Sequence, residues 1–582
     1  MNPLMHLGLC LTLSASALLG QALDERLAPK TPPRKGGKTK LPEPPASPQP
    51  SAEEEAPLAD KLNGLLILRS KDEIKREGVE NVAGLQISDI ALIRGPEFAK
   101  QLQPYFGKPV SLRTLKEMQR KIVLFCREHD RPLVDVIVPN QEVKNGVVQM
   151  VLIEGRLGNI TVKNEGTKWF KDEVITRGIR AASGDLIREK QLLSDVNWMN
   201  RNPFREVSLA FKQGERPGLS DLQLQVEDRF PLRVFAGYED TGSRITGEDR
   251  LVAGFNWGNV FGLDHQLNYQ FTTDPDFKTL TANSGSYVIP LPWRHVLTVF
   301  GSHVDITAET TATNVSQTGL NYQGSLRYSI PLPLLNKYQH EFFIGFDYKH
   351  NKNDLLFRSS AATLPISDTK TDVNQLAAGY SSLLTDRWGH TSLGVQGYYS
   401  PGGLYGKNDD SAFDAEHKGA KSSYLYGRVT AERITRLPWD FSWVLRLTGQ
   451  DADGNLVASE QLGVGGFSSV RGYDEREVNG DRGFYMNNEL RAPPFSLLRI
   501  FGKAKLADQL QFLGFWDYGL AENKDPLSNE STAHLQSVGG GLRYTVNRYL
   551  SVRFDYGIQL MDSGPTASNY GSRGHVGVIA SF

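Results

Sequence analysis

The feature that most constrains the fold is a two-residue alternation of apolar and polar side chains. Between Leu550 and Ile558 the even positions are apolar, and the odd positions are polar or glycine. The same period recurs over residues 342–348 and 441–448. Because residues two apart in a strand share a face, each segment predicts a strand with one apolar and one polar face. Residues 231–582 are therefore predicted to form an all-β domain.

Aromatic residues stand where strands of such a domain would begin or end. They are Trp257, Tyr287, Trp293, Tyr398, Tyr399, Tyr424, Tyr426 and Trp439. Aromatic belts at both membrane surfaces are typical of transmembrane β-barrels. The chain also ends on Phe582, which Ala580, Val578 and Val576 precede at steps of two. These patterns favour a transmembrane antiparallel β-barrel, and a soluble β-sandwich is the alternative.

Composition excludes two other classes of protein. The mean hydropathy is −0.37, and no long apolar run occurs beyond the N-terminus, which argues against a bundle of transmembrane helices. A barrel is compatible with this value because its strands average an apolar lipid-facing side with a polar lumen. Lys and Arg total 65 against 66 Asp and Glu, so the basic excess of a nucleic-acid-binding protein is missing.

Residues 1–22 are predicted to be a secretory signal peptide. An apolar run over residues 7–19 is followed by small residues at Gly20 and Ala22, the two positions that a signal peptidase reads. A short membrane anchor is the alternative.

Two cysteines occur in the chain. Cys10 sits too early and follows a bulky residue, which excludes a lipoprotein cleavage site. Removal of the signal peptide would leave Cys126 alone, so no intrachain disulfide can form. Its apolar neighbours predict a small buried side chain rather than a reactive thiol.

Residues 23–61 are predicted to be a linker. Proline is dense from residue 29 to residue 57, and such a composition gives an extended, mobile chain rather than a core. A proline-rich ligand for a partner protein is the alternative. Only residues 23–28 precede the prolines, which is too short for a stable isolated helix.

Two small α/β units are predicted between this linker and the barrel. In the first, residues 62–155, Ser111 can cap a helix whose apolar residues lie three or four apart. These residues are Leu115, Met118, Ile122 and Phe125. Strands are predicted over residues 134–138 and 147–153, with a turn at Asn145–Gly146.

The second unit, residues 156–230, repeats this order. Helices are predicted over residues 171–179 and 192–199, followed by strands near 207–211 and 222–226. The recurrence of strand, helix, helix, strand, strand indicates a tandem repeat of one module.

A glycine-rich loop near residues 463–480 is predicted to fold into a confined polar space. It carries a single arginine, Arg471, between Val470 and Gly472, with Tyr473 next. Glycine permits the turns that such a loop needs. A solvated surface turn is the alternative for a lone arginine in this setting.

A carboxylate partner for Arg471 is available about forty residues further on. Phe515, Asp517 and Gly519 follow one another at strand spacing, so their positions share one face. The aspartate is therefore the candidate partner of the arginine.

Both stretches resemble signature motifs of the two-partner-secretion outer-membrane transporters (the TpsB family), which export haemolysins and filamentous haemagglutinins. In that family a Val-Arg-Gly-Tyr loop folds back into the barrel, and its arginine meets the aspartate of a Phe-x-Asp-x-Gly strand. The resemblance implies that Arg471 contacts Asp517 within a barrel of sixteen strands. It also identifies the two α/β units as POTRA domains, and the segment from Gly237 to His265 as the first barrel hairpin.

The resemblance further implies a function and a location. The POTRA domains would lie in the periplasm and capture a secreted partner protein, and the barrel in the outer membrane would export it and activate it. Strand addition at an exposed sheet edge is the expected mode of capture. The C-terminal strand with Val576, Val578, Ala580 and Phe582 resembles the signal by which the barrel-assembly machinery recognises its substrates.

Enzymatic readings have no support in the sequence. The chain lacks a complete dinucleotide or phosphate loop, a His-Glu-x-x-His zinc motif and a Gly-x-Ser-x-Gly elbow. We therefore expect no catalysis, no cofactor, no metal and no nucleic-acid partner. The alternatives to a secretion pore are a factor that assembles other outer-membrane barrels and a simple diffusion porin.

Overall fold

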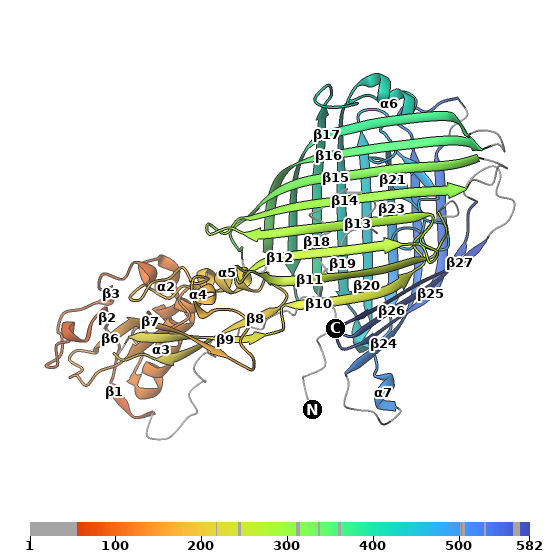
Figure 1. The fold of residues 1–582 in the computed structure, drawn as a ribbon. Coiled ribbons are helices and arrows are strands. Elements are labelled where there is room, and N and C mark those ends of the chain that lie inside the picture. Colours follow the sequence, from red (N-terminus) through yellow and green to blue (C-terminus); the bar gives the residue numbers. More distant parts are fainter. Residues whose placement is uncertain are drawn as a thin grey trace. The chain divides into compact units, whose positions relative to one another are not determined.

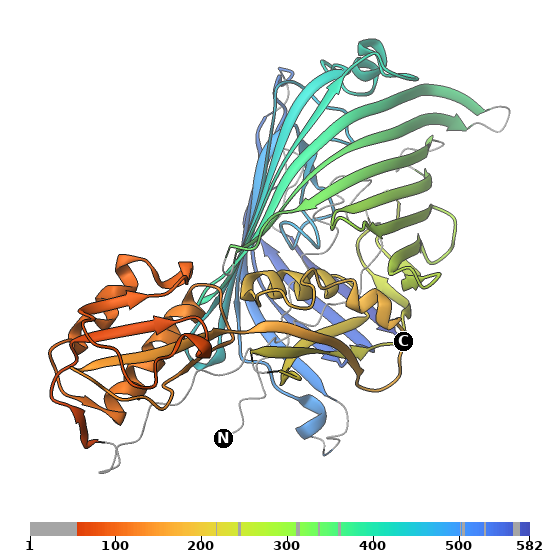
Figure 2. The same ribbon diagram turned by 90° about the vertical axis from the view of Figure 1, so that its left-hand side faces the viewer.

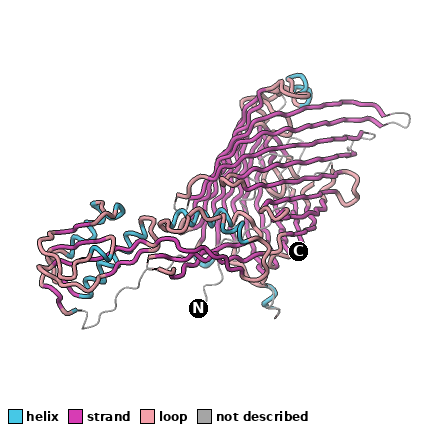
Figure 3. Tube along the Cα trace, turned by 60° about the vertical axis from the view of Figure 1, so that its left-hand side comes forward, coloured by secondary structure: helices cyan, strands magenta, loops and turns pink. Residues whose placement is uncertain are grey.

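The computed structural model describes residues 55–216, 218–242, 246–309, 315–335, 338–358, 363–500, 502, 507–528, 531–562 and 571–582. The predicted signal peptide and most of the predicted linker lie outside these residues. Contacts divide the chain into one unit that ends at Arg229 and another that includes all residues from Phe230 onward. Helices gather in the first unit, and strands fill the second (Figure 3).

The first α/β module has a four-stranded sheet in the order β3-β2-β6-β5. Its elements are β1 (Pro57–Ala59), β2 (Gly64–Leu68), η2 (Lys71–Glu73), β3 (Gly84–Ile87), η3 (Ala91–Ile93), α2 (Pro96–Leu102), η4 (Gln103–Tyr105), β4 (Val110–Ser111), α3 (Leu112–Glu128), β5 (Val134–Ile137) and β6 (Val147–Glu154). The Ser111 hydroxyl caps α3 by accepting from the Thr114 N–H at 3.2 Å. The predicted apolar stripe of α3 is buried against the sheet.

Two details of this module go beyond the sequence patterns. Strand β3 extends the sheet at its edge within a polar stretch that shows no strand period. The turn at Asn145–Gly146 has positive φ at both residues and leads directly into β6, but β5 already ends at Ile137. The connection between the two strands is therefore longer than a two-residue hairpin.

Cys126 is fully buried in the core of the first module, as its neighbours predicted. Burial raises the pKa of its thiol to about 12. The side chain therefore acts as a small apolar residue, because the reactive thiolate is disfavoured.

The second module contains a three-stranded sheet in the order β7-β9-β8. Its elements are β7 (Arg156–Asn164), α4 (Asp172–Thr176), α5 (Glu189–Met199), β8 (Arg205–Gln213) and β9 (Leu219–Asp228). Strand β9 is parallel to β7 and antiparallel to β8. The coiled ribbon of α5 lies along one face of these strands, drawn in gold in Figure 2. Helix α4 is shorter than predicted, because the chain turns at Gly178, where a Cβ would meet the Met199 sulfur at 2.4 Å.

Residues from Leu232 onward form a closed barrel of sixteen antiparallel strands (Figure 1). The strands are β10 (Leu232–Glu239), β11 (Arg250–Val260), β12 (His265–Thr273), β13 (Leu280–Pro290), β14 (Val296–Glu309), β15 (Val315–Pro331), β16 (Tyr338–Arg358), β17 (Thr363–Thr385), β18 (Gly389–Pro401), β19 (Ser423–Arg436), β20 (Ser442–Ala452), β23 (Arg482–Arg491), β24 (Asp508–Glu522), β25 (Ala533–Val546), β26 (Leu550–Gln559) and β27 (Ser572–Ser581). Pairing of β10 with β27 closes the ring, with Phe235 opposite Ser581. The predicted class and strand number are confirmed.

The barrel turns its apolar side chains outward. On β26, Phe554, Tyr556 and Ile558 are 37%, 45% and 48% exposed, whereas Asp555 and Gly557 between them are buried. A soluble sandwich would bury the apolar set instead, so that alternative is wrong. The outward apolar face is the one that a lipid bilayer covers.

Part of the predicted aromatic belt faces the other way. Trp293, Tyr399 and Trp439 are well exposed on the outer surface, but Tyr424 and Tyr426 are buried. Tyr398 is buried as well, and its ring stacks on Tyr426 with centroids 4.8 Å apart. These three tyrosines occupy lumen-facing positions of β18 and β19, so their assignment to the belt was wrong.

The remaining elements lie in connections between the barrel strands. They are α6 (Asp410–Glu416), η5 (Pro438–Asp440), β21 (Leu462–Val464), β22 (Val478–Gly480) and α7 (Leu497–Ile500). Among the helices in the described residues, none is both long and apolar enough to cross a membrane.

Candidate functional site: a hairpin inside the barrel

The connection between β20 and β23 folds back as a hairpin. Strands β21 and β22 pair antiparallel, and we call residues 462–480 the inward hairpin. Its apolar side chains form a small core with residues of the barrel wall. The buried members of this core are Leu462, Val464, Val470, Tyr473, Ala521 and Leu535. The last two lie on lumen-facing positions of β24 and β25, so the hairpin packs against the inside of the wall.

Arg471 lies near the turn of the inward hairpin and is 1% exposed. Its Nε and Nη2 donate to the two carboxylate oxygens of Asp517 at 2.7 and 2.8 Å. The Arg471 backbone N–H also donates to Asp517, at 3.2 Å. The two side chains thus form a bidentate ion pair, which fixes the direction of the guanidinium as well as its position.

Two further wall residues complete the environment of Arg471. Its Nη1 donates to Glu489 of β23 at 2.8 Å and to Asp555 of β26 at 3.3 Å. The Phe515 ring lies beneath the guanidinium, 3.6 Å from ring centre to Cζ. The hairpin is therefore bound to three strands of the wall through one side chain.

Gly472 brings the hairpin backbone into direct contact with the backbone of the wall. Its φ is +92°, and a Cβ there would meet the Gly557 carbonyl carbon at 2.9 Å. Its N–H donates to His575 Nε2 at 3.1 Å, and its carbonyl accepts from Gln559 Nε2 at 2.7 Å. Only glycine fits this position without strain or a shift of the wall.

The flanking residues fasten the turn of the hairpin further. The Tyr473 hydroxyl lies 2.8 and 2.6 Å from the Gln536 and Met561 carbonyl oxygens, and its single proton can be donated to either of them. Val470 is buried over Gly519, where a Cβ would lie 3.0 Å from the Val470 Cγ2. A side chain in place of Gly519 would thus push the hairpin away from β24.

Four further arginines lie close to the carboxylates that surround Arg471. Glu489 and Asp555 also form ion pairs with Arg446, Arg491, Arg543 and Arg553. Arg553 stacks over the Phe467 ring at 3.7 Å and donates to the Phe467 carbonyl at 2.5 Å. Arg553 thus holds the hairpin at Phe467, a different point from Arg471.

All seven residues predicted for this site lie together in the structure. The sequence patterns missed Glu489, Asp555, His575 and Gln559. Their signal was available, because Asp555 belongs to the polar set of β26 and Glu489 begins the Glu-Leu-Arg end of β23. What the spacing lacked was the strand order that brings β23, β24, β26 and β27 around one point.

The predicted barrel-insertion residues lie on β27 and at the chain end. Val576, Val578 and Ala580 are partly exposed, while His575 and Gly577, on either side of Val576, are buried. Phe582 is 74% exposed, and its backbone pairs with Val234 of β10 at 2.9 and 3.1 Å. These four side chains thus share the outward face beside the closing seam.

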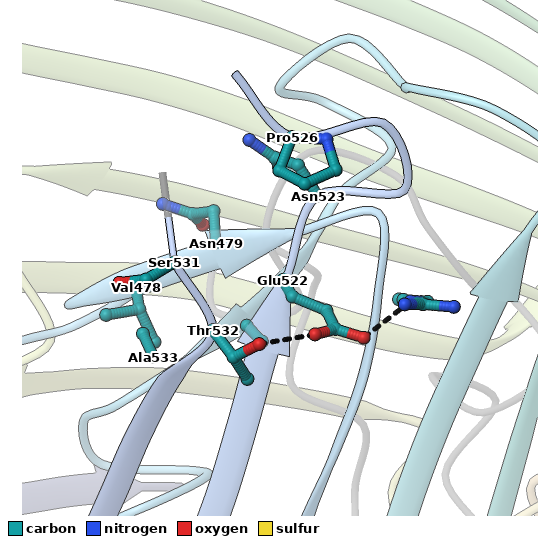
Figure 4. A pocket seen from close by; sticks show the side chains of 10 residues that line it. Val478, Asn479, Glu522, Asn523, Pro526, Ser531, Thr532 and Ala533 are labelled. Carbon is teal, nitrogen blue, oxygen red and sulfur yellow. Dashed lines mark hydrogen bonds and ion pairs between the residues drawn. The ribbon is translucent and has the colours of Figure 1, made fainter. Parts of the chain in front are cut away.

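A cavity of about 400 Å³ lies beside β22, at the ends of β23, β24 and β25 (Figure 4). Glu522 forms an ion pair with Arg482 at 2.5 Å and accepts from the Thr532 hydroxyl at 2.5 Å. The cavity is lined by residues of the hairpin base and of this part of the wall.

The groups of this site attach the inward hairpin to the barrel wall. They form ion pairs and hydrogen bonds, and the Arg471 guanidinium remains charged at any physiological pH. In the described residues no three His, Cys, Asp or Glu side chains come together as metal ligands.

Comparisons with known proteins agree with this architecture. Residues 218–544 match the family described as haemolysin secretion/activation protein ShlB/FhaC/HecB, and residues 81–155 match the ShlB-type POTRA domain. The heme/hemopexin transporter protein HuxB of Haemophilus influenzae strain 86-028NP is 23% identical over 77% of this chain and 78% of its own. The outer membrane transporter CdiB of Dickeya dadantii is 25% identical over 60% of this chain and 61% of its own.

Solved structures show the same fold. CdiB from Escherichia coli superposes with a TM-score of 0.70 at 18% identity, covering 92% of both chains. CdiB from Acinetobacter baumannii gives 0.60 at 18% identity over 96% of this chain and 95% of its own. The chain belongs to the ShlB/FhaC/HecB family of outer-membrane transporters, with its POTRA region in the periplasm.

Proposed function

We propose that this chain captures a secreted partner protein with its two α/β modules, exports it through the barrel and thereby activates it. The observation that carries this proposal is a closed barrel that contains an inward hairpin held by buried ion pairs. A diffusion porin needs neither the hairpin nor the modules. A transporter for an unfolded chain needs both a place for capture and a gate.

The inward hairpin has the properties of such a gate. Its ion pair with Asp517 is buried while the hairpin is seated, and both groups can be hydrated once it leaves. Because hydration offsets much of the attraction between buried charges, release costs less than the contact distances alone suggest. We propose that the partner displaces the hairpin during export, and that folding of the partner outside the cell supplies the drive.

Capture is proposed at a sheet edge of the second module. Within the described residues, strand β8 pairs only with β9 and has nine residues, as does β7 at the other edge, whereas the edge strands β3 and β5 of the first module have four each. A longer edge offers more unpaired backbone groups to an extended segment of the partner. A photo-crosslinking residue at Lys212 of β8 should therefore capture the partner, and one at Lys116 of α3 should not.

The outward face of β27 is proposed to contact the barrel-assembly machinery and outer-membrane lipid. Replacement of the exposed Phe582 by alanine removes the terminal aromatic side chain but keeps the backbone pairing with Val234. The expected result is a lower yield of assembled barrel, measured by heat-modifiable migration in gels. An unchanged yield would remove Phe582 from this role.

Export itself tests the proposal. A candidate partner, chosen as a large secreted protein encoded by a neighbouring gene, is co-expressed with the wild-type chain, or with a chain that lacks residues 57–228. We expect the partner in the medium only with the wild type. Loss of other outer-membrane proteins on depletion of the chain would favour a barrel-assembly factor instead. Conductance without export would favour a porin.

A further inference from the structure

A second buried ion pair lies at the base of the inward hairpin, far along the barrel ring from Arg471. Lys349 of β16 donates to Glu460 at 2.7 Å, and the two side chains are 2% and 0% exposed. Glu460 directly precedes the hairpin in the chain, two residues before β21 begins. In the ring, β16 and β24 are six places apart. The hairpin is thus tied to two different parts of the wall.

The carboxylate of Glu460 has a full set of partners. Gln375 of β17 and Tyr426 of β19 donate to its Oε2 at 3.1 and 2.9 Å. The Gln375 side chain is oriented by the Tyr424 hydroxyl, which donates to its amide oxygen at 2.8 Å. Side chains from three strands of the wall therefore converge on one carboxylate. Tyr426, which contacts it, and Tyr424, which orients Gln375, are both buried tyrosines that the sequence pattern placed in the outer aromatic belt.

Neighbouring contacts fasten the same segment. Asn351 of β16 donates to the Ser459 hydroxyl at 3.0 Å, and Gln450 of β20 donates to the Glu460 carbonyl at 2.9 Å. On the other side, His417 beyond α6 lies 2.7 Å from the Leu456 carbonyl. The segment just before the hairpin is held between the wall and the α6 connection.

We propose that Lys349 and Glu460 form a second anchor, which positions the inward hairpin and must separate before the lumen opens. The proposal rests on the gating function proposed above. Replacing a buried ion pair by apolar side chains often leaves stability unchanged or raises it, so stability alone gives no reason for this pair. When the two charged groups separate, water can hydrate both of them, so the contact can open and close. A packed apolar pair lacks this compensation.

The residues have positioning roles and do not touch the exported protein in the seated state. Loss of the Arg471 contacts would leave the base of the hairpin attached through Glu460. Loss of the Glu460 contacts would leave its turn attached through Arg471. Each anchor holds only one end of the hairpin, so weakening either one lowers the stability of the seated state and should raise the open fraction of the pore.

The test is single-channel recording of the full-length protein in planar bilayers. The variants are Lys349→Met, Glu460→Gln and the reciprocal exchange Lys349→Glu with Glu460→Lys. Lys352→Met is the matched control, because it removes a lysine from the same strand whose partner is Asp354, at 2.6 Å, and not the hairpin. Heat-modifiable migration in gels identifies the variants that have folded.

We expect Lys349→Met and Glu460→Gln to raise the open fraction roughly tenfold or more, and the control to leave it unchanged. The reciprocal exchange should return the open fraction toward the wild-type value, because it restores the attraction with the charges reversed. A folded Lys349→Met or Glu460→Gln protein with wild-type gating would overturn the proposal, as would a reciprocal exchange that gates like the single variants. If Lys349→Met does not fold, Glu460→Gln decides, since it keeps the size of the side chain.

These recordings need no partner protein, so they separate the anchor from the export function. If the Lys349 and Glu460 variants show a raised open fraction but the wild-type chain exports no partner in cells, the anchor is supported and the proposed function is contradicted. If the wild-type chain exports the partner but the Lys349 and Glu460 variants gate like the wild type, only the anchor is contradicted.

Discussion

The α/β modules and the barrel bury opposite kinds of side chain. In the second module the buried set is Leu222, Leu224 and Val226 of β9, and polar residues alternate with them on the outside. In the barrel the buried set includes Asp517, Asp555 and Glu489, and apolar residues face outward. The same two-residue period therefore serves two solvents, water around the modules and lipid around the barrel.

The difference shows where each region obtains its specificity. The modules are defined by apolar packing, which tolerates exchanges of similar volume. The interior of the barrel is defined by ion pairs and hydrogen bonds that fit only when every partner is in place. A polar interior can also be rehydrated, so a polar contact can open in a way that an apolar core cannot.

The largest effect is expected from a charge placed in the modules. Leu224→Asp puts an unpaired carboxylate into the core of the second module, and such changes cost on the order of 4–5 kcal/mol. Gln223→Asp, one residue away on the other face, should cost little. Limited proteolysis of the full-length protein should release the module only in the first variant, and equal resistance would contradict the assigned faces.

Loss of a charge from the lumen should come next. Arg471→Met leaves Asp517 without its bidentate partner, and breaking a buried pair costs roughly 3–5 kcal/mol. Arg471→Lys should retain the charge but lose the second hydrogen bond, giving a smaller effect. Arg482→Met is the control, because the side chains of its pair with Glu522 are 42% and 25% exposed. Urea titration of the folded barrels measures all three, and three similar midpoints would argue against a special role for Arg471.

A charge on the outer face should have a somewhat smaller cost. Leu376 on β17 is 55% exposed, and arginine at a lipid-facing site costs roughly 2–4 kcal/mol near the middle of the bilayer. Leu376→Ala separates the loss of the leucine from the gain of the charge. Reversible folding into lipid vesicles would measure both, and a harmless Leu376→Arg would mean that this face meets water.

The smallest effect at neutral pH concerns Cys126. Its folded pKa is raised to about 12, so its thiolate fraction at pH 8 is about one in ten thousand. Maleimide labelling of the native protein should be slow, and unfolding in urea should accelerate it greatly. Because the folded pKa lies above the unfolded one, this group favours the folded state less and less as pH rises from about 9 to 12. Rapid labelling at pH 8 would show that the core opens readily.

The sequence predicted the barrel well because lipid imposes a strict alternation on every strand. It also predicted the contact between Arg471 and Asp517, because each of these two residues belongs to a recognisable sequence motif. It failed for Tyr424 and Tyr426, since an aromatic residue near a strand end satisfies a belt and a lumen network equally well. It gave no sign of the pair between Lys349 and Glu460, because residues 111 apart meet only once the ring has closed.

The most direct test of the account is the conductance of a protein in which a short Gly-Ser linker replaces residues 463–479. Strands β20 and β23 remain, so the barrel can still close. We expect larger and more stable conductance steps than those of the intact protein, because the hairpin no longer fills the lumen. Equal conductance from two folded proteins would contradict the placement of the hairpin inside the barrel.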